Sequence, residues 1–158
     1  MTFFTLERVT PFQRSAGALR RADAGEVDRL APLAIAAARE MNLPKPEQEP
    51  EQVVRSLRRA IEEGRQFVWE NGGSVCAIAS YVDALASRGA RIRGVYTPPD
   101  HRCHGYGTAI TGSLAQFLLD TGQAWVCLFA DSANPVSIGI YQRLGFRPEG
   151  VYQSIRFD

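Results

Sequence analysis

The segment "VYTPPDHRCHGYGTAI", residues 95–110, constrains the fold more than any other part of the chain. Aromatic and β-branched residues at its start predict a strand, which Pro98 and Pro99 must end because proline donates no ladder hydrogen bond. Gly105 and Gly107 then precede apolar residues at helical spacing. The apolar run "AWVCLFA" after this helix is typical of a strand buried on both faces. The segment therefore predicts a strand–helix–strand crossover between parallel strands.

The first half of the chain predicts a short strand and two helices. "LRRADAGEVDRL" indicates a strand followed by a helix, which begins at a capping box of Asp23 and Glu26. Pro32 should kink or split this helix because proline removes an internal hydrogen bond. A second helix is expected to begin at Pro50, after the proline-rich connector "PKPEQEP", and to end at Gly64.

The second half combines strands with the crossover helix and one further helix. "QFVWENGGSVCAIASYV" is typical of a hairpin that turns at Asn71-Gly72, and "RIRGVYT" predicts another strand. "SANPVSIGIYQRLGF" predicts a helix with Asn134 as N-cap, Pro135 in the first turn and Gly145 just past its end. The alternating tail "GVYQSIRF" suits a last strand. This order predicts an α/β fold with one mixed sheet and helices on both faces.

Length, hydropathy and charge narrow the organisation and the partners. The chain has 158 residues, which suits one domain. Residues 1–18 show no clean helical or strand period of apolar residues, so we expect them to be an extended lead-in and residues 19–158 to form the domain. No apolar run approaches the roughly 20 residues that cross a bilayer, and "MTFFTLERVT" lacks the features of a secretory signal. The net charge of +1 gives no basic field for nucleic acid. We expect neither a membrane nor a nucleic acid as partner.

The cysteines and histidines indicate a reducing compartment and do not indicate a metal site. Cys76, Cys103 and Cys127 are an odd number, and two of them lie in expected strands, which favours free thiols in a reducing cytoplasm. His101, Cys103 and His104 are close enough in sequence to raise a metal site. Zinc sites usually need a second ligand pair at a distance, and the sequence has no further His and no C-x-x-C. We expect no metal.

The loop before the glycine-initiated helix can hold an anion. The first turn of a helix leaves about four backbone N–H groups unpaired, and the helix dipole adds roughly half a positive charge. Gly105 and Gly107 remove the side chains that would keep an anion away, and Arg102 and His104 add donors. Residues 102–107 therefore predict a phosphate or pyrophosphate site.

Two common phosphate-binding loops fit this segment poorly. A P-loop needs Lys after its second glycine, where this chain has Thr108-Ala109, so this motif is excluded. A dinucleotide fingerprint needs a third glycine, where this chain has Ile110, although Asp131 could mimic the ribose-binding acid. A dinucleotide-binding oxidoreductase domain stays as an alternative.

The third loop, R-x-x-G-x-G/A, is filled by Arg102-Cys103-His104-Gly105-Tyr106-Gly107. It resembles the pyrophosphate-binding loop of the GNAT superfamily of acyl-CoA-dependent N-acyltransferases. "VYTPPDHRCHGYGTA" is similar to the family's fourth strand and loop, and "CLFADSANPVSIGIYQRLGFRP" to its fifth strand, Asn-Pro helix and closing Gly-Phe. The resemblance is specific over about residues 90–149 and looser over residues 19–89. It implies a mostly antiparallel sheet of about six to seven strands whose parallel fourth and fifth strands splay apart.

The resemblance also implies acetyl-CoA as co-substrate. Backbone groups around residues 94–97 would pair with the amides of the pantetheine arm, and the thioester would lie between that strand and residues 127–130. The loop would hold the pyrophosphate, and Asn134 would contact the pantetheine or the loop besides capping its helix. The implied cofactor-binding residues are Val95, Tyr96, Thr97, Arg102, Cys103, His104, Gly105, Tyr106, Gly107, Thr108 and Asn134.

The chemistry implied is attack of a neutral amine on the thioester carbonyl, with a backbone N–H near Val95 stabilising the oxyanion. Tyr141 matches the tyrosine that protonates the leaving thiolate in this family; without the resemblance it is a packed aromatic between Ile138 and Leu144. Many relatives carry a cofactor-bonding Asn at the position of Ile138, so one contact is in doubt.

The general base and the acceptor are not assigned. Several relatives carry a glutamate on the fourth strand, where this chain offers Arg91 and Arg93. Glu70, Asp83 and Asp131 lie near the ends of expected strands, and we expect them to be solvated turn residues. By resemblance, the two early helices and the loop 83–89 would line the binding site of the acceptor. The arginines in these segments indicate an acidic group on the acceptor. A non-catalytic acyl-CoA-binding regulatory module stays as an alternative function, and a homodimer stays open.

Overall fold

The computed structural model describes residues 1–41, 44–84 and 88–151. Its strands are β1 (Thr2–Leu6), β2 (Ala18–Arg21), β3 (Gln66–Asn71), β4 (Ser74–Asp83), β5 (Gly89–Tyr96), β6 (Trp125–Ala130) and β7 (Arg147–Val151). Its α-helices are α1 (Val27–Glu40), α2 (Lys45–Gln48), α3 (Pro50–Glu62), α4 (Tyr106–Asp120) and α5 (Pro135–Leu144). Single 3₁₀ turns, η1 (Ala24–Glu26) and η2 (Pro99–His101), precede α1 and α4. No helix in these described ranges is long and apolar enough to cross a membrane.

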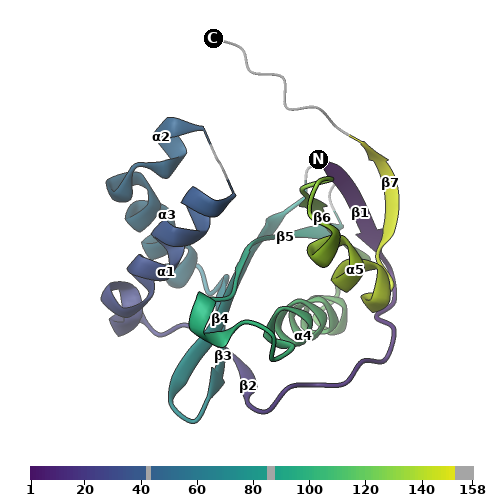
Figure 1. Ribbon diagram of the computed structural model, residues 1–158, viewed down its shortest axis with the longest axis horizontal. Helices are drawn as coiled ribbons and strands as arrows, with labels where there is room; N and C mark the ends of the chain where they lie inside the picture. Colours follow the sequence, from purple (N-terminus) through teal and green to yellow (C-terminus); the bar gives the residue numbers. More distant parts are fainter. Residues whose placement is uncertain (42–43, 85–87, 152–158) are drawn as a thin grey trace.

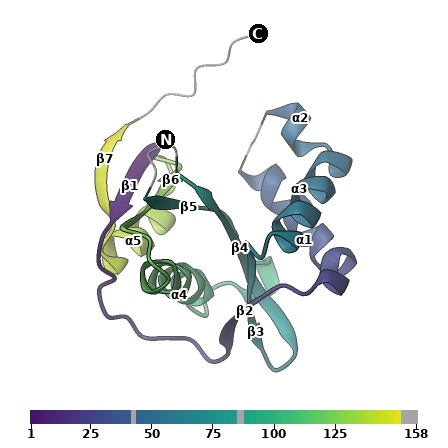
Figure 2. The same cartoon turned by 180° about the vertical axis from the view of Figure 1, so that it is seen from behind.

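The strands form one seven-stranded sheet in the order β2-β3-β4-β5-β6-β1-β7. All neighbouring strands are antiparallel except β5 and β6, which are parallel and joined by the crossover through α4. Helices α1–α3 lie on one face of the sheet, and α4 and α5 lie on the other (Figures 1 and 2). The mixed sheet with helices on both faces and one parallel pair is confirmed.

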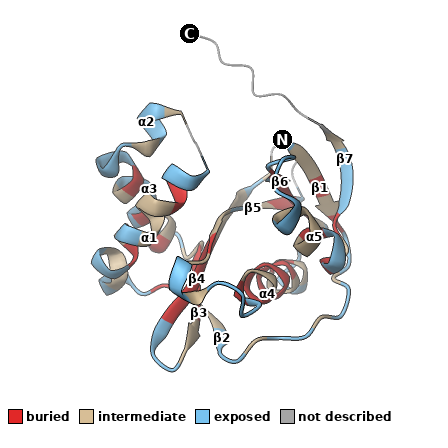
Figure 3. Ribbon diagram, viewed as in Figure 1, coloured by how far each residue is buried: buried red, intermediate tan, exposed pale blue. Residues whose placement is uncertain are grey.

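Each face of the sheet has its own core (Figure 3). Ala90 and Ile92 of β5 belong to the core under α4 and α5. Because successive side chains of a strand point to opposite faces, Arg91 and Arg93 lie on the face of α1–α3. The core on that face gathers over β3 and β4 and includes Leu30, Leu57 and Ile78.

Gly94 forms a β-bulge that changes which face β5 presents. Ile78 pairs with Tyr96 and Ser80 with Arg93, so two residues of β5, Gly94 and Val95, oppose one residue of β4. Gly94 has φ of 64°, a conformation that glycine adopts without strain. The extra residue shifts the alternation by one, so Tyr96 joins the core under α1 instead of the core under α4.

Residues 2–6 of the expected lead-in form β1, an interior strand between β6 and β7. Phe4 and Leu6 are buried in the core under α4 and α5. The N-terminal segment (residues 7–17) then runs along that face (Figure 1), where the Thr10 N–H donates to the Leu144 carbonyl at 2.9 Å. Phe12 lies so close to Gly112 of α4 that a Cβ there would meet its ring at 2.5 Å.

Three local predictions were wrong in detail. Pro32 does not split α1, because it stands near the helix start and removes only the hydrogen bond to Asp28. The connector "PKPEQEP" contains the short helix α2. The hairpin turns at Gly72-Gly73, with φ of 58° and 81°, because Asn71 pairs with Ser74 at the end of the ladder. The described part of the last strand is β7, Arg147–Val151, and the rest of its expected range lies outside the described residues.

A charged cluster ties β2 and β3 to the start of α1. Arg20 donates to the Glu26 carboxylate at 2.6 and 2.9 Å and to Glu70 at 2.9 Å. Glu26 also accepts from the Asp23 backbone N–H at 2.9 Å, which confirms the capping box. The hydrogen bonds from Arg20 outweigh burial and lower the pKa of Glu26 from 4.5 to about 2.

Replacing Glu26→Gln should lower the free energy of unfolding by about 2 kcal/mol at pH 7, because the half-buried Arg20 loses its charged partner. A lowered carboxyl pKa contributes stability above pH 4.5 that is lost as the pH falls toward 2. The advantage of the wild type over the variant should therefore shrink in urea unfolding between pH 5 and pH 3. Glu62→Gln, on the exposed face of α3, is the control and should change stability by less than about 0.5 kcal/mol. A constant difference across this pH range would contradict the assignment.

Candidate functional site

The parallel strands β5 and β6 stay together for only three pairs of residues. The ladder runs through Gly89–Trp125 and Ala90–Val126 and ends at Arg91–Cys127. Beyond that point, the edge of β5 that faces β6 has no strand partner in the described ranges, although β5 continues to Tyr96. Backbone N–H and C=O groups on that edge are therefore free to bind a ligand.

The bulge lies on this unpaired part of β5. Gly94 and Val95 oppose a single residue of β4, so one residue of the pair is left outside the ladder. Val95 packs against the core under α4, Tyr96 is buried and Thr97 is half-buried. The predicted backbone contacts for a cofactor arm thus come from the segment where β5 has left the ladder with β6 and carries the bulge in its ladder with β4.

Helix α4 begins beside the end of β5 with its first turn uncapped. Gly105 is the N-cap residue, has φ of 76° and offers no side chain to bind the first N–H groups. Tyr106, Gly107 and Thr108 supply these N–H groups, because residues in the first turn have no helical acceptor. The helix has 15 residues, so its dipole adds positive charge at this end. A Cβ at Gly107 would make only an ordinary contact with Ile140, at 3.5 Å.

The loop before α4 is held by contacts within itself and with distant segments. Cys103 is exposed with φ of 65°, and the Nδ1–H of His104 donates to the Arg102 carbonyl at 2.7 Å. The His104 ring stacks on Tyr106 with centroids 5.7 Å apart. The Tyr106 hydroxyl in turn accepts from the Asn71 amide at 3.2 Å. These contacts fix the loop conformation that leaves the helix start open.

Arg102, the predicted pyrophosphate donor, already has partners. Its Nε donates to the Thr97 carbonyl at 2.9 Å, and its Nη2 donates to both oxygens of Glu40 at 2.8 and 2.9 Å. The guanidinium also lies 5.7 Å from the centroid of the Tyr96 ring. The hydrogen bond with Glu40 raises the Arg102 pKa. The side chain therefore joins the loop to the end of β5 and to the last turn of α1.

Tyr141 lies on the buried side of α5. Its ring packs against Phe4 and Phe146, with centroids 6.1 and 5.9 Å away. Burial raises the pKa of the phenol to about 12. No described residue hydrogen-bonds to its hydroxyl, and this oxygen is not among the fully enclosed unpaired atoms, which are those of Thr111 and Ser113. Tyr141 is thus a packed aromatic and also a phenol that keeps its proton at neutral pH.

Asn134 is confirmed as the N-cap of α5, because its side-chain oxygen accepts from the Ser137 N–H at 3.2 Å. Ile138 packs against the core at the position where relatives were expected to carry an amide. The side chains of Asn134 and Tyr141 come from the two ends of α5, and the loop residues come from the start of α4.

The three acids near strand ends have other partners. Glu70 accepts from Arg20 at 2.9 Å and Asp83 from Arg65 at 3.1 Å. Asp131 accepts from the Ala133 N–H at 2.9 Å and closes its own turn. Each of these carboxylates therefore has at least one hydrogen-bond partner outside the gap between β5 and β6. The described ranges also contain no group of three His, Cys, Asp or Glu side chains that could hold a metal ion.

Sequence reasoning missed two residues that shape the loop. Glu40 binds Arg102 from 62 residues away, and the Ser15 hydroxyl donates to the His104 carbonyl at 2.6 Å from 89 residues away. Neither residue belongs to a motif, and no local pattern signals the contact. A Cβ at Gly105 would meet the Ser15 oxygen at 2.8 Å, so the segment 7–17 reaches the start of α4.

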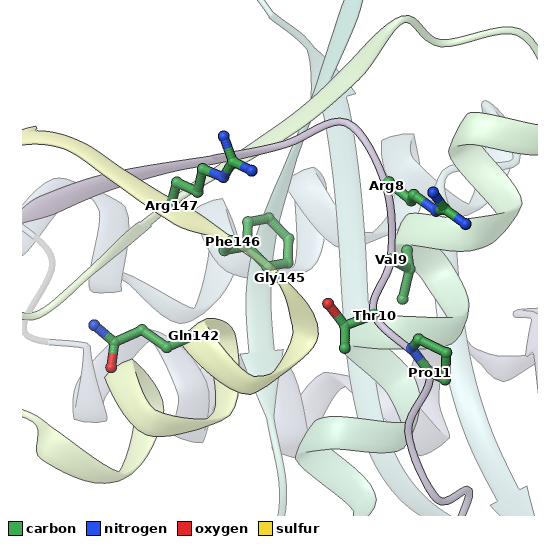
Figure 4. Close-up of a pocket in the computed structure, with 8 residues that line it drawn as sticks. All are labelled: Arg8, Val9, Thr10, Pro11, Gln142, Gly145, Phe146 and Arg147. Atoms are coloured by element: carbon green, nitrogen blue, oxygen red, sulfur yellow. The ribbon is translucent and has the colours of Figure 1, made fainter.

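Two cavities of about 460 Å³ each lie along this segment and not between β5 and β6. Figure 4 shows the first, between residues 8–11 and the end of α5 with Phe146 and Arg147. This cavity lies at the end of the sheet where Leu6 pairs with Val126. The gap between β5 and β6 opens toward the other end of the sheet. The second adjoins Gly105 and Thr108 at the start of α4.

Comparisons with known proteins agree with this geometry. Residues 34–146 match the model of the acetyltransferase (GNAT) family. A search of curated proteins gave no match. Among solved structures, an acetyltransferase from the GNAT family from Colwellia psychrerythraea is 13% identical with a TM-score of 0.75, covering 94% of this chain and 52% of its own. This chain therefore spans about half the length of that protein.

Two further structures match over most of their own length. A predicted acetyltransferase with acetyl-CoA from Clostridium acetobutylicum is 15% identical, with a TM-score of 0.69 and coverage of 88% of this chain and 95% of its own. A GCN5-related N-acetyltransferase from Ralstonia eutropha JMP134 is 21% identical, with a TM-score of 0.66 and coverage of 87% and 97%. At these identities the likeness shows the fold.

The burial of Tyr141 predicts a specific instability at high pH. The unfolded chain loses the phenol proton near the usual pKa of 10, whereas the folded chain holds it to about 12, so stability falls as the pH rises between these values. Relative to Tyr141→Phe, the wild type should lose about 1.3 kcal/mol of unfolding free energy between pH 9 and pH 11. Urea unfolding of both proteins measures this, and their difference should stay constant between pH 6 and pH 9. Parallel stability curves up to pH 11 would show that the phenol is not shielded from water.

Proposed function

Because this chain belongs to the acetyltransferase (GNAT) family, we propose that it transfers an acetyl group from acetyl-CoA to the primary amine of a small molecule or peptide. The observation that carries the proposal is the early end of the β5–β6 ladder at Arg91–Cys127, beside the bulge at Gly94. The uncapped first turn of α4 follows directly after β5 and η2. An extended arm and a phosphate group could therefore be bound by one continuous stretch of chain.

The residues present suit coenzyme A. The pyrophosphate would lie on the N–H groups of Tyr106, Gly107 and Thr108, where Gly105 adds no side chain and the helix dipole is positive. The amides of the pantetheine arm would pair with the backbone of residues 95–97. Cys103 and His104 would shape the loop through their backbone, and Arg102 would contribute either from its place beside Glu40 or after leaving it.

Asn134 would support the cofactor site from the start of α5, where its side chain already caps the helix. The thioester would then lie between β5 and β6, within reach of free backbone donors. The family uses acyl-CoA, and the free thiols of Cys76, Cys103 and Cys127 fit the reducing cytoplasm that we propose for this chain.

The reaction we propose is direct attack in a ternary complex. The neutral amine attacks the thioester carbon, a C–N bond forms, and the oxygen becomes an oxyanion that a backbone N–H near Val95 can stabilise. The C–S bond then breaks, and the leaving thiolate takes a proton from the Tyr141 hydroxyl, which its raised pKa keeps protonated. The amine proton passes to water, and water returns a proton to the Tyr141 phenolate, because Glu70, Asp83 and Asp131 already hold other partners.

A non-catalytic acyl-CoA-binding module is the second candidate. It is favoured by the engagement of Glu70, Asp83 and Asp131 elsewhere and by the apolar Ile138 at an expected cofactor contact. Such a module would bind coenzyme A and regulate a partner without turnover. Binding without turnover on any amine of a broad panel would favour it, and clear turnover would exclude it.

Coenzyme A binding is tested by thermal unfolding with coenzyme A, acetyl-CoA and NAD. A ligand at 100 times its Kd should stabilise the folded chain by about 2.7 kcal/mol, which raises Tm by several degrees. We expect this with both coenzyme A species and not with NAD. A Tm that no coenzyme A species raises would overturn the proposal.

Gly107→Asp with the matched control Gly107→Ala locates the binding site. A carboxylate in the first turn suits the helix dipole and has room beside Ile140, so the variant should fold. It should nevertheless lose the Tm shift with coenzyme A, because the carboxylate repels the pyrophosphate. Gly107→Ala should keep most of the shift. Equal shifts in both variants would place the phosphate elsewhere.

The role of Tyr141 is tested by Tyr141→Phe once an acceptor is found. The variant should lower kcat by about 10²- to 10⁴-fold, the usual contribution of a general acid, while the Tm shift with coenzyme A is retained. Unchanged turnover would remove Tyr141 as the acid and leave it as a packing residue.

A further inference from the structure

The acceptor can reach the thioester from only one face of the sheet. On the face of α4 and α5, Ala90, Ile92, Val126 and Leu128 are buried in the main core. Ile110, Leu114 and Leu118 of α4 are buried in the same core, so this side of β5 and β6 is already covered. On the opposite face, the core under α1 and α3 gathers over β3 and β4 and reaches β5 only at Tyr96. The acceptor must therefore approach over the α1 side of β5 and β6.

The side chains on that open face are Arg91 and Arg93 of β5 with Cys127 and Phe129 of β6. The Arg91 guanidinium lies over the Phe129 ring, 5.8 Å from its centroid, and so extends from β5 across β6. Phe129 keeps 37% of its surface exposed, unlike the other apolar residues of β6 that face the main core. Arg91 itself stands at the last paired position, where the two strands begin to part.

The two arginines carry positive charge that the described part of the chain does not neutralise. Neither forms an ion pair with a described acid, in contrast to Arg20, Arg65 and Arg102. Desolvation, and after it the like charge of Arg91, lower the pKa of Arg93. Glu47 of α2 raises this pKa, but it acts from beyond ion-pair distance. Two like charges side by side at a substrate face are stabilised when an anion binds between them.

We propose that the acceptor is an amine that also carries an oxyanion, a carboxylate or a phosphate, which Arg91 and Arg93 bind on this open face. Guanidinium groups pair with both anions through two parallel hydrogen bonds. Anchoring the anion there holds the amine of the same molecule near the thioester between β5 and β6. This inference names the substrate class of the proposed acetyltransferase and rests on that function.

The experiment compares amines in matched pairs that differ only in the anion. Suitable pairs are 4-aminobutanoate with butylamine, alanine with ethylamine, and phosphoethanolamine with ethanolamine. Calorimetry on the wild type saturated with coenzyme A, which cannot transfer an acetyl group, measures binding without turnover. We expect at least one anionic member to bind at least 10-fold more tightly than its neutral partner, and the same preference in kcat/KM with acetyl-CoA. The pair that shows it identifies carboxylate or phosphate.

Three variants test whether the arginines cause this preference. Arg93→Gln and Arg91→Gln should each raise the Kd of the anionic amine by about 10- to 100-fold, which is the size of one lost hydrogen bond to a charged group. In turnover with acetyl-CoA, the same loss should raise KM more than it lowers kcat. Both should keep the Tm shift with coenzyme A. The control Arg58→Gln removes an exposed arginine of α3 that has no ion pair in the described ranges, and it should leave acceptor binding unchanged.

The outcomes separate this inference from the proposed function. If coenzyme A raises Tm but neutral and anionic amines bind alike, or if the anionic preference survives in both Gln variants, the inference is overturned and the acetyltransferase stands. If no coenzyme A species raises Tm, the proposed function itself fails.

Discussion

The structure depends on a parallel ladder that is only three residues long. Antiparallel neighbours on both sides hold β5 and β6 in the sheet, so these strands can part after Arg91–Cys127 without opening the core. Trp125 fixes the closed end, because a Cβ at Gly89 would run into its ring. The bulge at Gly94 then leaves one more residue of β5 outside its ladder with β4, which resumes at the Ile78–Tyr96 pair. Unpaired backbone is thereby concentrated on one short segment, immediately before the helix whose first turn is also unpaired.

The elements that depend on local chemistry could be predicted from the sequence. Proline ends β5 within one residue of the expected place, Asn134 caps α5, and Asp23 with Glu26 starts the first helix, because each effect acts through the residue's own backbone. The order of these elements was enough to predict one mixed sheet. The resemblance of the glycine loop then predicted the splayed parallel pair.

Features that depend on distant partners could not be predicted. The interior place of β1 follows from the free edges of β6 and β7, which no period in residues 2–6 encodes. Glu40 and Ser15 have no motif, since they act only after folding brings α1 and the N-terminal segment to the loop. The hairpin turn moved by one residue because ladder pairing of Asn71 with Ser74 outweighed the turn preference of Asn-Gly. The charge of the open face was visible in the sequence, but its lack of neutralisation was not.

The place of β1 has a consequence for how the chain folds. Its partners begin at residues 125 and 147, so this strand pairs only with strands that lie far later in the chain. Contacts of such long sequence separation slow folding, because a large loop must close before they form. Until then Phe4 and Leu6 are apolar side chains of a strand that has not yet joined the sheet, the kind of segment that chaperones bind. The sheet is completed in its middle and not at an edge, so the core under α4 and α5 is complete only when β1 has joined β6 and β7.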